Sequence, residues 1–465
     1  MFLENQTKTI KNVPSFFYSN AFSWIFALVV YIFWLTNFTF VGMFIILSLS
    51  AFIFCICRDT TPNLVITMLM VFEINASDFT TGGIIWLSCG IALVIIGMII
   101  HLIRFKPSFL FLKPNKIKGY TFAVLLILPV VALGGVTMTN RNGIVFFAIA
   151  LCSIAISLMY LFFYATTNNG QKDEMLKIII RTIMVMGALI CVQMLTIAFK
   201  AGSLEAIKIV IDRRQFALSW AHPNNVAILL ALSIPMTLYY ATKLKKTPIF
   251  PIALAILEFA IMLLTTSRGP ILFTAVALPI IAVFVFIKAK NRKQVGISFG
   301  ICILLAVAFV VVFKDTIQDL FARFLELGLS DNGRFDIYRE AVSLFKTAPI
   351  FGIGLDYGFG IWGTYQFYWF HSTIFQILAS FGIFGVLCFA YFFFARYRAF
   401  LIKPSTAKLA VLAGLLLMEA YGMVDIVFFN SYTYIIMMFL CLGAEKSLDE
   451  KQGLAFPQIK QKKSN

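Results

Sequence analysis

The sequence predicts an all-α, polytopic membrane protein with about fourteen transmembrane helices. Two features of the composition lead to this prediction: 61% of the 465 residues are hydrophobic, and only 13% are charged. The 51 phenylalanines would need a core larger than a soluble chain of this length can enclose, whereas lipid accepts them without penalty. The third feature is a series of apolar runs, most of them long enough to cross a bilayer as a helix.

The apolar runs extend along almost the whole chain. They cover residues 20–36, 40–57, 62–74, 84–103, 120–138, 144–164, 178–199, 225–241, 249–266, 270–287, 295–313, 371–394, 409–424 and 431–445. The polar start of the chain lacks the short apolar core and cleavage site of a signal peptide, so we expect the first run to be retained.

The basic residues between the runs predict the orientation. With the N-terminus in the cytoplasm, every dense basic cluster lies on the cytoplasmic side, as positive-inside topology requires. These clusters are Arg58, the lysines of 106–118, Lys172 with Lys177, the lysines of 243–246, the basic residues of 288–293, those of 396–408, and the tail IKQKK. The net charge of +17 lies largely in such short clusters, so it does not indicate a nucleic-acid partner.

The chain divides into four predicted parts. Residues 1–199 are N-terminal membrane helices, and 200–313 are membrane helices with an arginine-bearing outer loop and a Ser-Arg-Gly turn. Residues 314–370 form a large extracytoplasmic loop, and 371–465 form the C-terminal membrane helices with a basic cytoplasmic tail. The eight cysteines lie in or beside apolar runs and the three histidines are scattered, so we predict no metal site, no disulfide and no cofactor.

Residues 330–385 are the most informative segment. Ser-Asp-Asn at 330–332 are good N-cap residues, and apolar positions then recur at roughly helical spacing until Pro349. This pattern predicts a short amphipathic helix with Arg334 in its first turn, where free backbone N–H groups favour an anion. His371 opens the next run at the outer interface and is a candidate proton acceptor, or alternatively an interfacial anchor.

The glycines between these two elements do not form a nucleotide-binding motif. Gly352, Gly354, Gly358 and Gly360 lack a surrounding strand-turn-helix unit, so a dinucleotide fingerprint is rejected. We expect them to allow a tight re-entrant loop at the membrane surface.

Several arginines lie on the predicted outer side, where positive-inside topology disfavours them. Arginine grips phosphate bidentately without losing its proton, so this gathering predicts an extracytoplasmic anion site. The arginines are Arg213, Arg214, Arg268, Arg323, Arg334 and Arg339. For Arg323 and Arg339, an open alternative is pairing with an acidic residue, namely Asp212, Asp315, Asp319, Glu326 or Glu340. For Arg334 alone, the alternative is pairing with Asp331 or Asp336.

Three acidic residues are also candidates. Glu258 and Glu419 lie within apolar runs, where an ionisable residue is functional by default. The alternative for Glu258 is a neutral acid that is hydrogen-bonded between helices. Asp425, at the last outer turn, is either a helix-end solvation residue or a second acid near the site.

Three segments of the C-terminal half, in this order, resemble the O-antigen ligase and polymerase superfamily, the bacterial membrane glycosyltransferases that act on undecaprenyl-diphosphate-linked glycans. They are RRQFALSWAHPNNVAILLALSIP at 213–235, TTSRGP at 265–270, and GRFDIYREAVSLFKTAPIFGIGLDYGFG followed by HSTIFQILASFGIFG within 333–385. Two positions depart from the family: Ser372 replaces the usual Asn after the histidine, and His222 stands where a small residue is commoner.

The resemblance implies a lipid-donor (GT-C-like) glycosyltransferase that needs no metal. It implies roles for Arg214 or its neighbour Arg213, and for Arg268, Arg334 and His371, around a cavity that holds the lipid diphosphate and the acceptor. Together with the outer arginines, the predicted site has His371, Arg334 and Arg214 as catalytic residues and Arg213, Arg268 and Arg339 as diphosphate ligands.

The predicted function is a polymerase that joins undecaprenyl-diphosphate-linked oligosaccharide repeat units of a surface polysaccharide. About fourteen spans and a long helical outer loop favour it over a ligase that moves finished glycan to a lipid, protein or wall acceptor. Two rival functions are a lipid-linked glycan or anion transporter and a non-catalytic assembly subunit. The expected partners are the glycan donor and acceptor, the lipid bilayer, and flippase and chain-length regulator proteins. The expected location is a bacterial inner (plasma) membrane, with the site on the extracytoplasmic face.

Overall fold

The computed structural model describes most of the chain and shows a helical protein. The described residues are 15–74, 81–138, 143–167, 174–212, 222–312, 333–355, 369–449 and 451–456, with Leu218, Lys314 and Gln318. Within these residues every regular element is a helix, and one isolated β-bridge joins Lys118 to Leu454.

The helices follow the predicted apolar runs closely. The N-terminal ones are α2 (Asn20–Leu35), α3 (Thr39–Ile56), α4 (Thr61–Leu69), η1 (Met70–Glu73), α5 (Thr81–Phe105), η3 (Leu110–Leu112), α6 (Gly119–Leu133), α7 (Gly143–Thr166) and α8 (Glu174–Ala201). They are followed by α9 (Leu204–Asp212), α10 (Pro223–Lys243), α11 (Ile249–Leu264), α12 (Arg268–Lys288), α13 (Arg292–Val312), α15 (Arg334–Thr347), α16 (Thr373–Leu401), α17 (Thr406–Gly422), η4 (Val427–Phe429) and α18 (Ser431–Lys446).

Length and composition identify the helices that are able to cross a membrane. Among the described residues, seven helices are long and apolar enough: α3, α5, α7, α8, α10, α12 and α16. The apolar helices α2, α4 with η1, α6 and α11 are shorter. The all-helical, multi-pass prediction is therefore confirmed, and the count of about fourteen spans stays a prediction.

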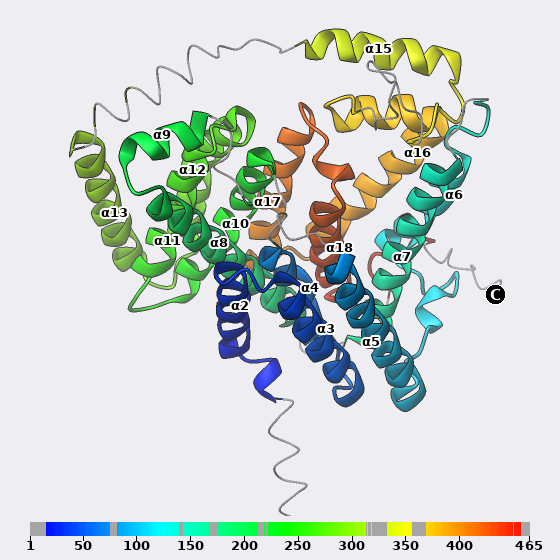
Figure 1. Cartoon of the computed structure of the whole chain (residues 1–465), viewed down its shortest axis with the longest axis horizontal. Coiled ribbons are helices and arrows are strands. Elements are labelled where there is room, and N and C mark those ends of the chain that lie inside the picture. The colour runs from blue at the N-terminus through cyan, green and yellow to red at the C-terminus, as the bar shows by residue number, and fades with distance from the viewer. Residues whose placement is uncertain are drawn as a thin grey trace, which may run out of the picture.

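Helix α10 lies at the centre of the bundle. It packs against α8, α11, α12 and α17, and 89% of its apolar window is buried inside the protein, compared with 17% for α5 and 11% for α7 (Figure 1). A helix that is apolar all round belongs either in a core or in lipid. Helix α10 lies in the protein core, whereas α5 and α7 expose most of their surface, as lipid-facing helices do. The start of α10 is therefore packed on several sides and supports the residues around it.

Helix α16 is broken, although the sequence predicts one continuous span over 371–394. Gly382 has φ 60° and ψ −158°, and the two parts of α16 run in different directions (Figure 1). Residues 349–354 lie against the break and satisfy its backbone: the N–H groups of Ile353 and Gly354 donate to the carbonyls of 379 and 380, while those of 383 and 384 donate to the carbonyls of 349 and 350.

The break needs glycine on both sides of this contact. A Cβ at Gly382 would come within 2.6 Å of the Ile350 backbone, and one at Gly352 would come within 2.3 Å of the Ser380 backbone. Unwound backbone is tolerated at a membrane surface only where protein groups or water pair with it. The predicted tight loop is thus present for Gly352 and Gly354, whereas Gly358 and Gly360 lie outside the described residues.

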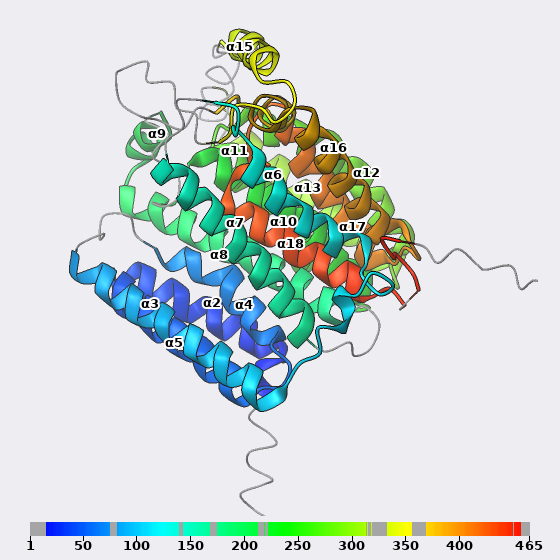
Figure 2. The same ribbon diagram turned by 90° about the vertical axis from the view of Figure 1, so that its right-hand side faces the viewer.

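Helix α15 lies across one end of the bundle, over the first part of α16 (Figures 1 and 2). Its inner face buries Ala341, which forms a small second core with Ala348, Ile353, Phe370 and Ala379. The predicted amphipathic helix is confirmed, since it begins at Arg334 and ends one residue before the Ala348–Pro349 step.

The ends of α10, α12 and α17 define two faces of the protein. Asn224 at the start of α10 lies near the start of α12 and the end of α17, and the other ends of these helices carry Lys243, Lys288 and Lys408. The predicted outer ends of these three helices therefore lie together, and so do their predicted cytoplasmic ends. After the predicted topology, we call the two ends of the bundle the outer end and the inner end.

Basic side chains cap helix C-termini at the inner end. The Lys118 ammonium donates to the carbonyls of Glu445 (2.9 Å) and Leu448 (2.8 Å) at the end of α18, and Lys446 donates to the Tyr164 carbonyl (2.7 Å) at the end of α7. Arg104 and Lys408 do the same for α3 and α16. Cations stabilise helix C-termini because the last carbonyls lack intrahelical partners, so these lysines have a structural as well as a topological role.

Candidate active site

Asp425 is the centre of a polar network at the outer end. Its carboxylate accepts hydrogen bonds from Asn224 Nδ2 (3.1 Å), the Tyr421 hydroxyl and the Ile426 backbone N–H (2.8 Å). The second carboxylate oxygen, Oδ1, also lies 3.4 Å from His371 Nδ1. Three segments that are far apart in sequence, at 224, 371 and 421–426, therefore meet at one acidic side chain.

These contacts favour the charged form of Asp425. Burial alone would raise the pKa of the carboxyl group, but hydrogen bonds from His371, Tyr421 and Ile426 lower the pKa to about 2. Asp425 is therefore a carboxylate at neutral pH. Of the two roles open for it from sequence, the structure supports an acid beside the predicted site histidine, since Asp425 contacts His371 directly.

His371 is held in an unusual backbone conformation. Its φ is 46°, in the left-handed region that a residue with a side chain rarely adopts. The Tyr338 hydroxyl of α15 donates to the His371 carbonyl (3.1 Å), and the preceding Phe370 N–H donates to Gln376 Oε1 (3.0 Å). The side chain of His371 is 44% exposed, so the imidazole is accessible while its Nδ1 lies near Asp425.

The Ser-Arg-Gly turn reaches the same network. Ser267 Oγ donates to Asn224 Oδ1 (2.9 Å), and Arg268 is the first residue of α12 and is half-buried. A Cβ at Gly269 would come within 2.5 Å of the Tyr421 ring, so this glycine allows the turn to pack directly on the tyrosine that binds Asp425. The network therefore links Arg268 to the histidine through packed neighbours.

Arg334 belongs to α15, the helix that lies across the outer end. It is half-buried at the start of α15, directly after Gly333, and its charge interacts with the hydroxyl groups of both Tyr338 and Tyr421. Burial raises the pKa of Tyr338, an effect that Arg334 opposes and Asp425 reinforces. Arg334 and Asp425 therefore act on the same two tyrosine hydroxyl groups with opposite charge.

The other predicted arginines are not part of the described network. Arg339 forms an ion pair with Asp336 (2.6 Å) in which both side chains are about four-fifths exposed, at 80% and 78%. Arg339 is therefore paired with an acidic residue, but its partner is Asp336, which the sequence offered as a partner for Arg334. Arg213, Arg214 and Arg323 lie outside the described residues.

A partly buried ion pair joins α16 to α17 near the network. Arg396 is fully buried and donates to Glu419, and both line a cavity of about 230 Å³ that also contacts Thr373 and Gly422. Arg396 was expected in a basic cytoplasmic loop, but α16 continues to Leu401, so the arginine belongs to the helix. Glu419, a functional candidate from sequence, has Arg396 as its partner.

Glu258 matches the alternative that the sequence left open for it. It is fully buried and accepts hydrogen bonds from Ser233 Oγ (2.8 Å) and Thr237 Oγ1 (3.0 Å) of α10. Gly187 of α8 makes room for it, since a Cβ there would come within 2.1 Å of the carboxyl. These contacts are those of an acid that is hydrogen-bonded between helices.

The remaining groups at the outer end have structural roles or lie apart. His222, which had no assigned role, is the N-cap of α10 and accepts from the Asn224 N–H through Nδ1 (3.2 Å). Within the described part of the chain, no three His, Cys, Asp or Glu side chains are placed to hold a metal ion.

Sequence reasoning missed the neutral members of the network. Asn224, Ser267, Tyr338 and Tyr421 gave no signal of their own, because single polar residues beside apolar runs are common at membrane interfaces. Asn224 and Ser267 do lie within the two short motifs on which the resemblance rests, so motif membership was the one usable clue.

Comparison with known families supports the resemblance that the sequence motifs indicate. Residues 252–390 match the Wzy_C family model, described as O-antigen ligase. No curated protein matches the sequence. The match confirms the resemblance, and it includes Arg268, Arg334, Arg339 and His371, whereas Asn224 and Asp425 lie outside it. The family implies a membrane enzyme of the O-antigen ligase or polymerase type, which transfers glycans from lipid-linked substrates.

Proposed function

We propose that this protein is a polymerase that joins undecaprenyl-diphosphate-linked oligosaccharide repeat units of a surface polysaccharide, at the extracytoplasmic face of a bacterial inner membrane. The observation that carries the proposal is the contact of His371 with the buried carboxylate of Asp425, beside Arg334 and Arg268. A histidine oriented by a carboxylate, next to half-buried arginines, suits transfer of a sugar from a diphosphate leaving group.

In this mechanism His371 is the general base. Asp425 holds the Nδ1–H tautomer, so Nε2 is left to accept the proton of an acceptor sugar hydroxyl. The hydroxyl oxygen attacks the anomeric carbon of the donor while the bond from that carbon to the diphosphate oxygen breaks. The proton moves to His371, and the bonding electrons leave with the diphosphate.

The arginines stabilise the departing anion. Arg334 and Arg268 are the described candidates, and Arg214 and Arg213 are proposed to complete the set from the neighbouring loop. Arg339 is proposed as an outer diphosphate contact, which requires it to leave its exposed pair with Asp336. Since arginines supply this charge, the proposed transfer is independent of a metal ion.

A ladder assay tests the proposal. Purified protein in nanodiscs receives a defined undecaprenyl-diphosphate oligosaccharide as its sole substrate, and wild type is compared with His371→Ala and Arg334→Ala. A ladder of lengthened lipid-linked glycans that both variants abolish supports the polymerase. Transfer that needs an added lipid, protein or wall acceptor identifies a ligase, and no transfer to any acceptor refutes glycosyl transfer.

The face of the membrane is tested separately. Lys346→Cys at the outer end and Lys293→Cys at the inner end are both exposed positions. A membrane-impermeant maleimide is expected to label the first in intact cells and the second only after permeabilisation. The opposite pattern contradicts the proposed face.

A further inference from the structure

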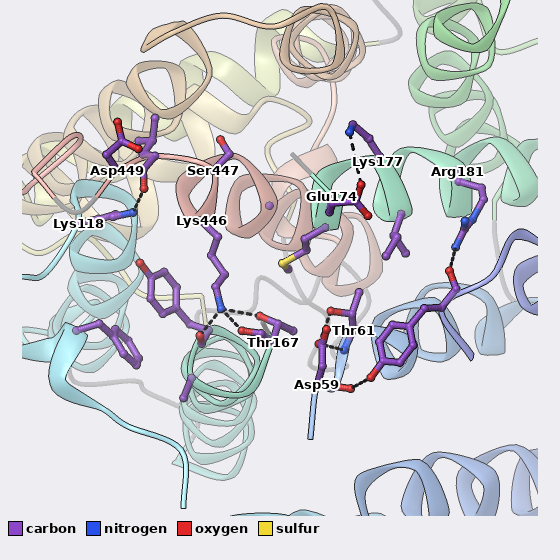
Figure 3. A pocket seen from close by; sticks show the side chains of 18 of the residues that line it. Asp59, Thr61, Lys118, Thr167, Glu174, Lys177, Arg181, Lys446, Ser447 and Asp449 are labelled. Carbon is purple, nitrogen blue, oxygen red and sulfur yellow. Dashed lines mark hydrogen bonds and ion pairs between the residues drawn. The ribbon is translucent and has the colours of Figure 1, made fainter. Parts of the chain in front are cut away.

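A large cavity lies at the inner end, and His371 is not among the residues that line it. It has a volume of about 1450 Å³ and is formed by the N-terminal ends of α4 and α8, the C-terminal ends of α7, α10 and α18, and the segment before α6 (Figure 3). Its walls come from both halves of the chain. A ligand in it therefore contacts helices that come from distant parts of the sequence.

The cavity is strongly cationic. Seven basic residues line it, against three acidic ones: Lys116, Lys118, Lys177, Arg181, Lys243, Lys290 and Lys446, with Asp59, Glu174 and Asp449. Each acidic group already has a partner, since Asp449 pairs with Lys403 (2.9 Å), Glu174 pairs with Lys177 (3.7 Å), and Asp59 accepts from the Thr61 N–H (2.9 Å). The excess positive charge therefore favours an anion.

Arg181 is the best-placed group for such an anion. It is 8% exposed and donates to Asn20 and to the Tyr18 carbonyl (3.4 Å) through its two terminal nitrogens. Its Nε is buried and has no hydrogen-bond partner among the described residues. A buried guanidinium N–H without an acceptor is costly, and a phosphate oxygen can satisfy it once the Arg181 side chain turns toward the cavity. Figure 3 shows Arg181 and Lys177 on one side of the cavity and Lys118 and Lys446 on the other.

Apolar surface adjoins this charge. Leu110, which lines the cavity, is 51% exposed, and the neighbouring Phe109 is 41% exposed. Phe111, which follows Leu110, packs its ring on that of Tyr164 with the ring centroids 4.3 Å apart, and both residues line the cavity. A free anion would gain nothing from the apolar side chains of Phe109 and Leu110. A lipid, in contrast, places its headgroup among the cations and its acyl chains along these two side chains.

We propose that this cavity binds the phosphate-bearing headgroup of an anionic phospholipid from the inner leaflet. The phosphodiester lies against Arg181 and Lys177 of α8 and against Lys116 of the segment before α6, and the acyl chains leave over Phe109 and Leu110. The bound lipid joins α8 to this segment, whose Lys118 donates to the carbonyls at the end of α18, so it stabilises the contact between the two halves of the bundle. This proposal is independent of the reaction at the outer end.

Lipid retention measures the proposed site directly. Protein in nanodiscs of equal parts phosphatidylglycerol and phosphatidylcholine is released into detergent, and the retained lipids are counted by native mass spectrometry. Wild type is expected to retain phosphatidylglycerol selectively. The double variant Lys116→Gln/Lys177→Gln removes two exposed cavity cations and is expected to weaken retention about thirtyfold. Arg181→Gln is expected to weaken it further.

Controls separate the proposal from its rivals. Lys293→Gln removes an exposed charge at the same end but outside the cavity, and it is expected to retain lipid like wild type. Inorganic phosphate and diphosphate at millimolar concentration are added as competitors. Equal retention of both lipids, equal loss in Lys293→Gln, or displacement of the lipid by free phosphate or diphosphate would each overturn the proposal. Because the double variant changes only exposed side chains, a folding defect in Arg181→Gln leaves the test intact.

Discussion

The two ends of the bundle use charge differently. At the inner end, lysines and arginines are numerous and bind the carbonyls at helix C-termini, as Lys118, Lys446 and Lys408 do. At the outer end one carboxylate, Asp425, gathers neutral donors and a histidine. Inner charges therefore complete helices, whereas the outer charges are held by side chains from separate helices.

The comparison distinguishes charges that set the membrane orientation from charges that are available for a reaction. Positive-inside topology explains why the inner end is basic, and helix capping gives those side chains a fold-stabilising role. Neither explains Arg268, Arg334 and the His371–Asp425 pair, which lie where basic residues are disfavoured. The predictions below therefore compare changes in the outer network with matched changes elsewhere.

The largest effect is expected for His371→Ala. Loss of the general base should lower the rate of glycan transfer about 10²- to 10⁴-fold, with donor binding retained. Single-turnover transfer in nanodiscs measures the rate. The control is His222→Asn, which replaces the other outer-end imidazole by another good N-cap residue and should leave the rate within a few-fold of wild type. If both variants lose the same share of the transfer rate, the cause is a folding defect at the outer end and not the loss of a general base.

A smaller loss is expected for Arg334→Lys. Lysine keeps the charge but cannot reproduce the bidentate fork, so transfer should fall about 10- to 100-fold while membrane insertion is unchanged. Arg268→Lys should behave alike. Arg339→Lys should lose less, because Arg339 is exposed and paired with Asp336. Full activity in both the Arg334 and Arg268 variants contradicts the diphosphate site.

Gly269→Ala tests the packing between the Ser-Arg-Gly turn and Tyr421. The added methyl group would come within 2.5 Å of the ring, so the tyrosine must move and the stability should fall by about 1–3 kcal/mol. Gly300→Ala in α13 is the matched control, since nothing lies within 4 Å of its Cβ position. Melting in nanodiscs compares the two, and equal melting temperatures would show that this contact is not tight.

The smallest effect concerns acid stability. The pKa of Asp425 is lowered to about 2, so its stabilising contribution is complete above the unfolded pKa near 3.8 and is lost as the pH falls toward 2. Between pH 5 and pH 3 the wild type should lose about 1 kcal/mol that Asp425→Asn does not lose. Chemical denaturation in nanodiscs measures this difference. The same pH dependence in both proteins means that Asp425 is not held as a carboxylate.

Sequence reasoning succeeded where the signal was local. Apolar runs located the helices, and the helical spacing of apolar residues before Pro349 located α15, with Arg334 in its first turn. The N-cap is Gly333, whereas the predicted N-cap residues 330–332 lie outside the described residues. It failed at Gly382, because the run around that glycine is uniformly apolar and the break depends on backbone pairing with residues 349–354. It also misplaced Arg396, whose partner Glu419 comes from the next helix.

The candidate site was predicted only in part for the same reason. His371 and the arginines are visible as residue types that are unusual at an outer interface. The contact between His371 and Asp425 joins residues 54 positions apart and depends on how α16 and α17 pack. No local pattern encodes that distance, so the sequence left Asp425 with two roles open.

The most direct test of the account is a double-mutant cycle on His371 and Asp425. If Asp425 acts by orienting His371, Asp425→Asn should slow single-turnover transfer in the wild type but have no further effect in His371→Ala. The account predicts that the double variant transfers glycan at the rate of His371→Ala alone. Independent losses that multiply in the double variant would contradict it, because the two residues would then not act as one unit.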